Sequence, residues 1–219
     1  EVTGLPSPLD STLSRRTALR GFGALGLTAA GLLASTQAHA SGDLVVVDQI
    51  GTGPWDTENC GPTSTVIAMV AAGREVRHYV SGEKGTMVGG NRRAVIEMRA
   101  RCGLSPWGEP EKKSVDYTGA YLGDLEDGLR DAGARATRAR FEEGLEAAAR
   151  DKVVILHVHH GRLLGEEEAD YGHFVVAQGA DENGNLRVSD PGRAQEIGIT
   201  TYSPDRLRHA RQGLATVVS

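Results

Sequence analysis

One stretch fixes how the first half of this chain can fold: Asn-Cys-Gly-Pro-Thr-Ser over residues 59–64, then a mostly apolar run to Ala72 and Gly73. Proline suits the first turn of a helix because it needs no donor there and its φ is already near helical. Glycine commonly ends a helix. The pattern therefore predicts a buried helix with Cys60 in its first turn.

The position of Cys60 makes it a candidate nucleophile. The positive end of the helix dipole favours thiolate over thiol, and Gly61 places no side chain against the sulfur. A small buried thiol that packs in a core helix is the alternative, and this stretch alone does not exclude it.

Residues 1–40 have the three parts of an export signal. Arg15 and Arg16 form a twin-arginine pattern, residues 21–33 are apolar, and Ala-His-Ala at 38–40 is an A-x-A cleavage site. The apolar run is short for a membrane span; an anchor helix is the alternative. We expect the twin-arginine translocation machinery as a partner, cleavage near Ala40, and a secreted or cell-envelope location without a stable membrane anchor.

The remaining 179 residues, 41–219, suit one domain with a real core. Three of the 24 basic and two of the 29 acidic residues lie in residues 1–40, which leaves a net charge of −6 on the mature domain. A mildly acidic surface argues against nucleic acid or an anionic membrane as a partner. We expect a monomer.

The two cysteines, Cys60 and Cys102, would ordinarily predict a disulfide in an exported protein. A bond between them would remove the candidate nucleophile. The twin-arginine route carries folded proteins, so Cys60 can fold reduced. Cys102 follows a helical segment, and we expect it to be an ordinary buried thiol.

Helical patterns precede strand patterns along the mature chain. The expected helices cover residues 60–72, 91–101, 122–133 and 142–151, with a short one from 203. The expected strands cover residues 43–49, 153–159, 173–179, 185–190, 196–202 and 214–218. This order predicts an α+β domain with an antiparallel sheet.

A nucleophilic cysteine needs a base, and the base needs a third group to orient it. If the Asp-Glu-Asn-Gly turn has four residues, Ala180 pairs with Asn185 and His173 faces Gly192. Asp190 is then the diagonal neighbour of His173 on the same face of the sheet. A shorter turn separates them by one further pair, and a surface histidine beside a turn aspartate is the alternative interpretation.

Three other histidines compete with His173 as functional groups. The three are His157, His159 and His160. His157 and His159 share a strand face, and with the acidic loop over residues 166–170 they could form a zinc site. No third ligand is fixed, so a half-exposed strand that tolerates histidines is the favoured interpretation. The acidic loop either selects basic substrates or is a solvated run of charges.

Together, these motifs resemble the bacteriocin-leader (double-glycine) peptidases and their stand-alone relatives. That family is number thirty-nine of the cysteine peptidases, in the papain-like clan. The resemblance rests on the Asn-Cys-Gly-Pro-Thr-Ser stretch, on Gly-His-Phe-Val-Val about 110 residues later, and on Ser-Asp-Pro after a hairpin. It covers nearly all of the mature chain and implies a papain-like fold, with the cysteine on N-terminal helices and the histidine and aspartate on the sheet.

The resemblance also implies a role for each matching residue. Cys60 is similar to the family's nucleophile, His173 to its general base and Asp190 to its orienting acid. Gln49 is similar to the glutamine that donates to the oxyanion together with the Cys60 amide. No cofactor or metal is implied. We expect the chain to differ from the family's transporters, with an export signal before the domain and no transporter segments after it.

These residues predict a cysteine peptidase or amidase that cleaves a peptide or protein substrate through a thioacyl-enzyme. The same triad would serve an acyltransferase or a transglutaminase-like enzyme if an amine replaced water as the acceptor. A catalytically inactive binding domain with the same fold is the alternative from another class.

Overall fold

The computed structural model describes residues 44–106, 119–166 and 171–219. The expected export signal over residues 1–40 lies outside these ranges and stays a prediction. Residues 107–118 and residues 167–170 of the acidic loop also lie outside these ranges. Within the described ranges, no helix combines the length and the apolar character needed to cross a membrane.

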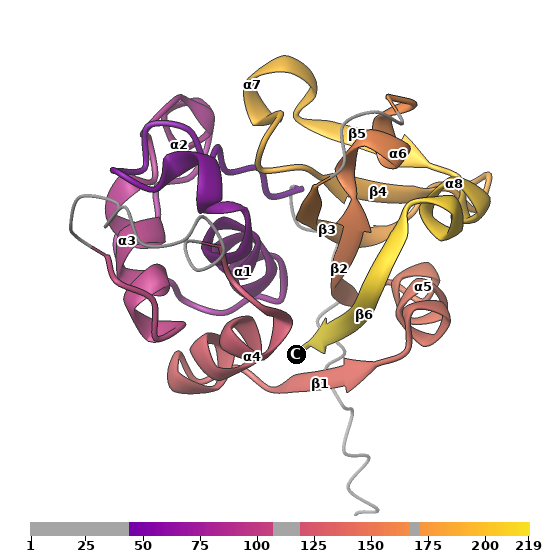
Figure 1. Cartoon of the computed structure of the whole chain (residues 1–219), viewed down its shortest axis with the longest axis horizontal. Helices are drawn as coiled ribbons and strands as arrows, with labels where there is room; N and C mark the ends of the chain where they lie inside the picture. The colour runs from indigo at the N-terminus through magenta and orange to yellow at the C-terminus, as the bar shows by residue number, and fades with distance from the viewer. Residues whose placement is uncertain (1–43, 107–118, 167–170) are drawn as a thin grey trace, which may run out of the picture. The chain divides into compact units, whose positions relative to one another are not determined.

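Helices come first and a sheet follows, as the sequence predicts (Figure 1). The first group consists of the 3-10 turn η1 (Asp56–Glu58), α1 (Cys60–Ala71), α2 (Glu83–Thr86), α3 (Arg92–Arg101) and α4 (Leu122–Asp131). Shorter helices lie among the strands: α5 (Phe141–Ala149), α6 (His160–Leu164), α7 (Ala194–Ile197) and α8 (Pro204–His209).

The sheet has six strands in the order β1-β6-β2-β3-β4-β5, and every neighbouring pair is antiparallel. Their bounds are β1 (Ala136–Ala139), β2 (Val153–His159), β3 (Gly172–Ala180), β4 (Leu186–Ser189), β5 (Ile199–Tyr202) and β6 (Arg211–Val218). The expected α+β class is confirmed. β1, α6 and α7 were not expected from the sequence. Residues 196 and 197 belong to α7, so the strand expected over residues 196–202 begins only at Ile199.

Both faces of the central strands are covered. Along β2, Val153 and Ile155 pack toward the cluster that contains α1, α3 and α4, whereas Val154 and Leu156 pack toward α5 and α8. Alternate side chains of a strand point to opposite faces, so a strand covered on both faces reads as one continuous apolar run. In Figure 1, α1, α3 and α4 lie on one side of the sheet, and α5 and α8 lie on the other.

Residues 44–49 do not form the strand that their β-branched composition predicts. Val45 instead exchanges two hydrogen bonds with the side chain of Gln178: its N–H donates to Oε1 and its C=O accepts from Nε2, both at 2.8 Å. The side chain of Gln178 therefore makes the hydrogen bonds to Val45 that a neighbouring strand would make, and residues 44–49 are not a strand of the sheet.

The β3–β4 hairpin differs from the prediction at its turn and agrees with it near the site. The first pair beyond the turn is Ala180–Leu186, not Ala180–Asn185. An irregularity between Ala177 and Ala180, where Gly179 has a φ of +91°, absorbs one residue. Val176 then pairs with Ser189, which is the register expected from the sequence.

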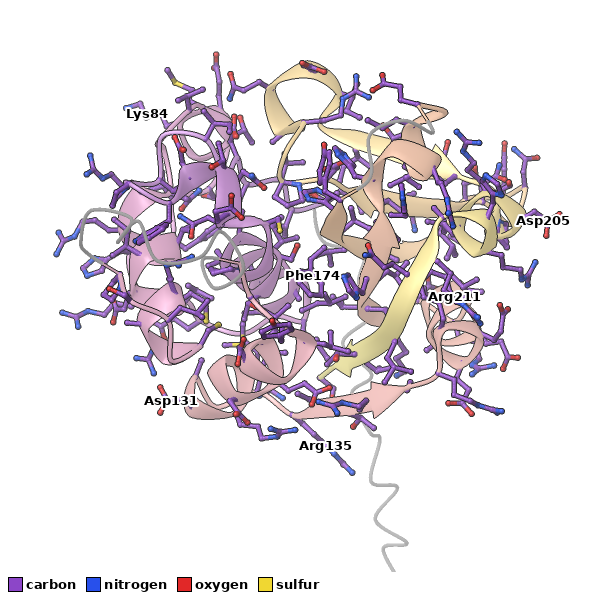
Figure 2. The ribbon with its side chains drawn as sticks, viewed as in Figure 1. Lys84, Asp131, Arg135, Phe174, Asp205 and Arg211 are labelled. Atoms are coloured by element: carbon purple, nitrogen blue, oxygen red, sulfur yellow. The ribbon has the colours of Figure 1, made fainter. Side chains whose placement is uncertain are left out.

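Gly61 is buried where α1 meets α4 and the sheet. A Cβ atom added there would lie 2.8 Å from Ala120 Cβ, 2.9 Å from Leu125 Cδ2 and 3.5 Å from Phe174 Cδ2. Phe174 lies at this junction of helices and sheet (Figure 2). The glycine therefore permits close packing of the Cys60 helix, a role different from the expected one of leaving the sulfur uncrowded.

We expect Gly61→Ala to lower the free energy of unfolding by about 1–3 kcal/mol, because the added methyl group overpacks this junction. Urea denaturation measures the change. Gly119→Ala is the matched control, since among the residues that the structure describes its Cβ would meet only Glu58 Oε2, at 3.8 Å. Equal stability of the two variants would contradict this account of Gly61.

Candidate active site

Cys60 is the first residue of α1, as predicted, and its side chain is partly exposed. Helix α1 is tied to β3 by Ser64, whose hydroxyl donates to the carbonyl oxygen of Phe174 at 3.0 Å. Ser64 lies one turn after Cys60, and Phe174 follows His173 in the chain. This hydrogen bond therefore fixes the start of α1, with Cys60, against the part of β3 that carries His173.

Cys102 is chemically separate from Cys60. Both thiols are free, so the pair forms no disulfide. Cys102 is buried at the end of α3, and burial raises the pKa of its thiol to about 12. The expectation of an ordinary buried thiol is confirmed.

His173 and Asp190 form a buried pair across the hairpin. His173 is the second residue of β3, Asp190 directly follows β4, and His173 Nε2 lies 2.7 Å from Asp190 Oδ1. The same oxygen accepts from the Gly192 N–H at 2.9 Å. A Cβ at Gly192 would lie 3.3 Å from His173 Cε1, so His173 faces Gly192 as the register predicts.

The environment of His173 favours its charged form. Burial alone would lower its pKa, but hydrogen bonds with Asp190 and with the Cys60 thiol, and the charges of both, raise the pKa to about 10. Since Nε2 is engaged by Asp190, Nδ1 is the ring nitrogen left for the thiol. His173 thus hydrogen-bonds Asp190 and is close enough to Cys60 for the cysteine to raise its pKa.

Asp190 has a second histidine partner that sequence reasoning missed. His160 Nε2 lies 2.9 Å from Asp190 Oδ2, and His160 Nδ1 is hydrogen-bonded to the Tyr171 hydroxyl. Burial would raise the pKa of Asp190, but the hydrogen bonds from His160 and His173 hold it well below its usual range. Each carboxylate oxygen therefore has its own imidazole.

The interpretation of residues 157–160 as a half-exposed strand with tolerated histidines is wrong. His159 and His160 are buried, and His157 stacks on Phe174 with ring centroids 4.7 Å apart. The sequence did not predict that His159 pairs with Gly172 across the antiparallel strands β2 and β3. This pairing brings His160, which follows β2, beside Tyr171, which precedes β3. That pairing was not derivable without knowing that β2 neighbours β3.

Gln49 reaches the site through the loop that precedes α1. Its backbone N–H donates to the carbonyl of Pro191 at 3.0 Å, next to Asp190. Its side chain is buried, and Nε2 donates to the Thr57 carbonyl at 3.1 Å. Oε1 accepts no hydrogen bond from the residues described. Gln49 is therefore held at the aspartate side of the site.

The same side chains form a group that could hold a metal ion. The donor atoms of His160, His173 and Asp190 lie within 4.8 Å of one another. Each imidazole faces a different oxygen at hydrogen-bond distance, however, and the arrangement is satisfied without a cation. The zinc site considered around His157 and His159 does not form among the described residues.

A cavity of about 510 Å³ opens beside Cys60. One wall comes from residues 119–123 ahead of and within α4, and the other from Gly172, Phe174 and Leu214 on the sheet. The partly exposed thiol thus borders a hollow large enough for part of a peptide chain.

Comparison with solved structures identifies the fold. A protein from Bacillus anthracis described as a C39-like peptidase superposes with a TM-score of 0.51 at 12% identity, over 81% of this chain and 95% of that chain. This chain has the fold of a C39-like peptidase. The papain-like arrangement expected from the sequence is confirmed at the level of the fold.

Two further solved structures are similar to this chain. The peptidase domain of Streptococcus ComA, a bifunctional ABC transporter of a quorum-sensing pathway, has a TM-score of 0.48 and 20% identity, over 81% of this chain and 98% of that one. A double-glycine-motif protease from an AMS/PCAT transporter, in complex with the leader peptide, has a TM-score of 0.47 and 16% identity, over 81% and 94%. No protein-family model and no curated protein matches the chain.

We expect His173 to be an imidazolium at pH 7 and to lose its proton only as the pH rises toward about 10. Asp190→Asn should lower that pKa, because the carboxylate favours the charged ring. Nitrogen-15 NMR of the imidazole groups measures both. His157, whose pKa burial lowers, is the internal control and should be neutral at pH 7. A neutral His173 at pH 7 would contradict the assigned pairing.

Proposed function

We propose that this chain is a cysteine peptidase or amidase in which Cys60, His173 and Asp190 form the catalytic triad. The observation that supports this most strongly is the buried His173–Asp190 hydrogen bond, 2.7 Å long, on a histidine whose pKa is raised by that aspartate and by Cys60 at the start of α1. A nucleophile, its base and an orienting acid are the three groups that such catalysis requires.

The reactive form is a thiolate–imidazolium pair, in which the proton of the Cys60 thiol has passed to His173. The raised pKa of His173 favours this charged ring at neutral pH. The thiolate attacks the carbonyl carbon of a peptide bond, and the negative charge moves to the carbonyl oxygen. Asp190 keeps the ring oriented and stabilises its positive charge.

We assign two donors to that oxyanion. The backbone N–H of Cys60 is the first of α1 and has no acceptor within its own helix. Gln49 uses one amide hydrogen for the Thr57 carbonyl, which leaves the other for the substrate. Such a donor typically contributes about 3 kcal/mol to the transition state.

Release of products completes the cycle. The His173 imidazolium protonates the leaving amine as the C–N bond breaks, and the acyl group remains on Cys60 as a thioester. A water molecule then gives a proton to His173 and attacks the thioester, which frees the acid and restores the thiol. His160 holds the second oxygen of Asp190 throughout, so the carboxylate does not rotate away from His173.

We expect Cys60→Ala and His173→Gln each to reduce peptide turnover by roughly 10³-fold or more, because removal of either member disables the triad. Mass spectrometry of a peptide library incubated with the purified chain under reducing conditions measures cleavage. Cys102→Ala removes the other thiol and is the matched control, with turnover retained. Undiminished cleavage by Cys60→Ala would refute the proposed function.

A further inference from the structure

Arg99 is a buried cation that the proposed reaction does not use directly. It lies in α3 with 2% of its surface exposed. Its Nε donates to the Ser105 carbonyl at 2.8 Å and its Nη1 to Asn59 Oδ1 at 2.9 Å, while the guanidinium lies 5.2 Å from the centre of the Trp55 ring. Both Asn59 and Trp55 belong to the loop that delivers Cys60.

The contact with Asn59 continues as a relay of hydrogen bonds to Gln49. Asn59 is fully buried, and its Nδ2 donates to Thr52 Oγ1 at 2.9 Å. The Thr52 hydroxyl in turn donates to the Gln49 carbonyl oxygen. The relay therefore connects α3 to the residue before Cys60 and to the main chain of Gln49.

The chemistry of these groups permits only one direction for the relay. A guanidinium has no acceptor, so Asn59 must present its oxygen to Arg99 and its NH₂ to Thr52. The Thr52 hydroxyl accepts that bond and has its hydrogen available for Gln49. Asn59, although it is the N-cap residue of α1, makes no side-chain capping bond. Its side chain serves the relay in place of the usual capping role.

Burying a guanidinium is costly unless its hydrogen bonds are well placed. An apolar side chain at position 99 would fill the same space at a smaller desolvation cost. It could not, however, hydrogen-bond to Asn59 in the loop before Cys60. We propose that Arg99 is a positioning residue for the oxyanion site: through Asn59 and Thr52 it sets the Cys60 amide and Gln49 relative to each other. This inference rests on the proposed function.

Two small reagents separate positioning of the oxyanion donors from reactivity of the thiol. In acetylation by p-nitrophenyl acetate, Cys60 sulfur bonds to the carbonyl carbon, negative charge builds on the carbonyl oxygen, and p-nitrophenolate leaves. In alkylation by iodoacetamide, sulfur bonds to the methylene carbon and iodide leaves, with no charge on an oxygen. Only the first reaction needs the oxyanion donors.

The experiment measures both rates at Cys60 in the purified chain, together with the midpoint of urea unfolding. Arg99→Lys keeps the charge and loses the fork of donors, and Thr52→Val removes the last link of the relay. We expect acetylation to fall by roughly 10²-fold, as displacement of a catalytic group by about 1 Å can cause, with alkylation within about threefold of wild type. Arg101→Lys is the matched control on the same helix, where Arg101 pairs with Glu97 and Asp131.

Two results would overturn the proposal and leave the proposed function intact: both rates unchanged in Arg99→Lys and Thr52→Val, or both rates falling in parallel with the unfolding midpoint. The second result would mean that Arg99 only stabilises the fold. A wild-type chain that p-nitrophenyl acetate does not acetylate at Cys60 would instead refute the proposed function, and the positioning role with it.

Discussion

The carboxylate of Asp190 is the group on which the rest of the site depends. It is 1% exposed and accepts hydrogen bonds from His173, His160 and the Gly192 amide. A buried charge is tolerated only when it is paired and hydrogen-bonded. The two imidazoles meet that need and in return are held in fixed orientations, so His173 presents its remaining ring nitrogen to Cys60.

The fold brings these groups together from distant parts of the chain. Helix α1 supplies the cysteine, the β3–β4 hairpin supplies His173 and Asp190, and the turn after β2 supplies His160. Ser64 on α1 and the Gln49 amide each bond to the backbone next to a site residue. The first bond fixes α1 to β3, and the second fixes the loop before α1 to the segment that follows β4.

Local signals allowed much of this to be predicted from the sequence. Cys60 is marked by Pro62 and the apolar run after it. The hairpin register beside His173 is the expected one, but the turn is not: Ala180 pairs with Leu186, and an irregularity between Ala177 and Ala180 restores the register. The remainder depends on tertiary contacts that no local pattern encodes. Gln178 replaces a strand neighbour of Val45, and His160 meets Asp190 only because β2 lies beside β3.

The central claim is that Cys60 carries the acyl group during turnover. The most direct test is to quench the chain with acid while it cleaves a peptide, digest it, and locate any thioester by mass spectrometry. The account predicts an acyl group on Cys60 in the wild type and none in His173→Gln. Cleavage with no acyl group on Cys60, or with one on another residue, would contradict it.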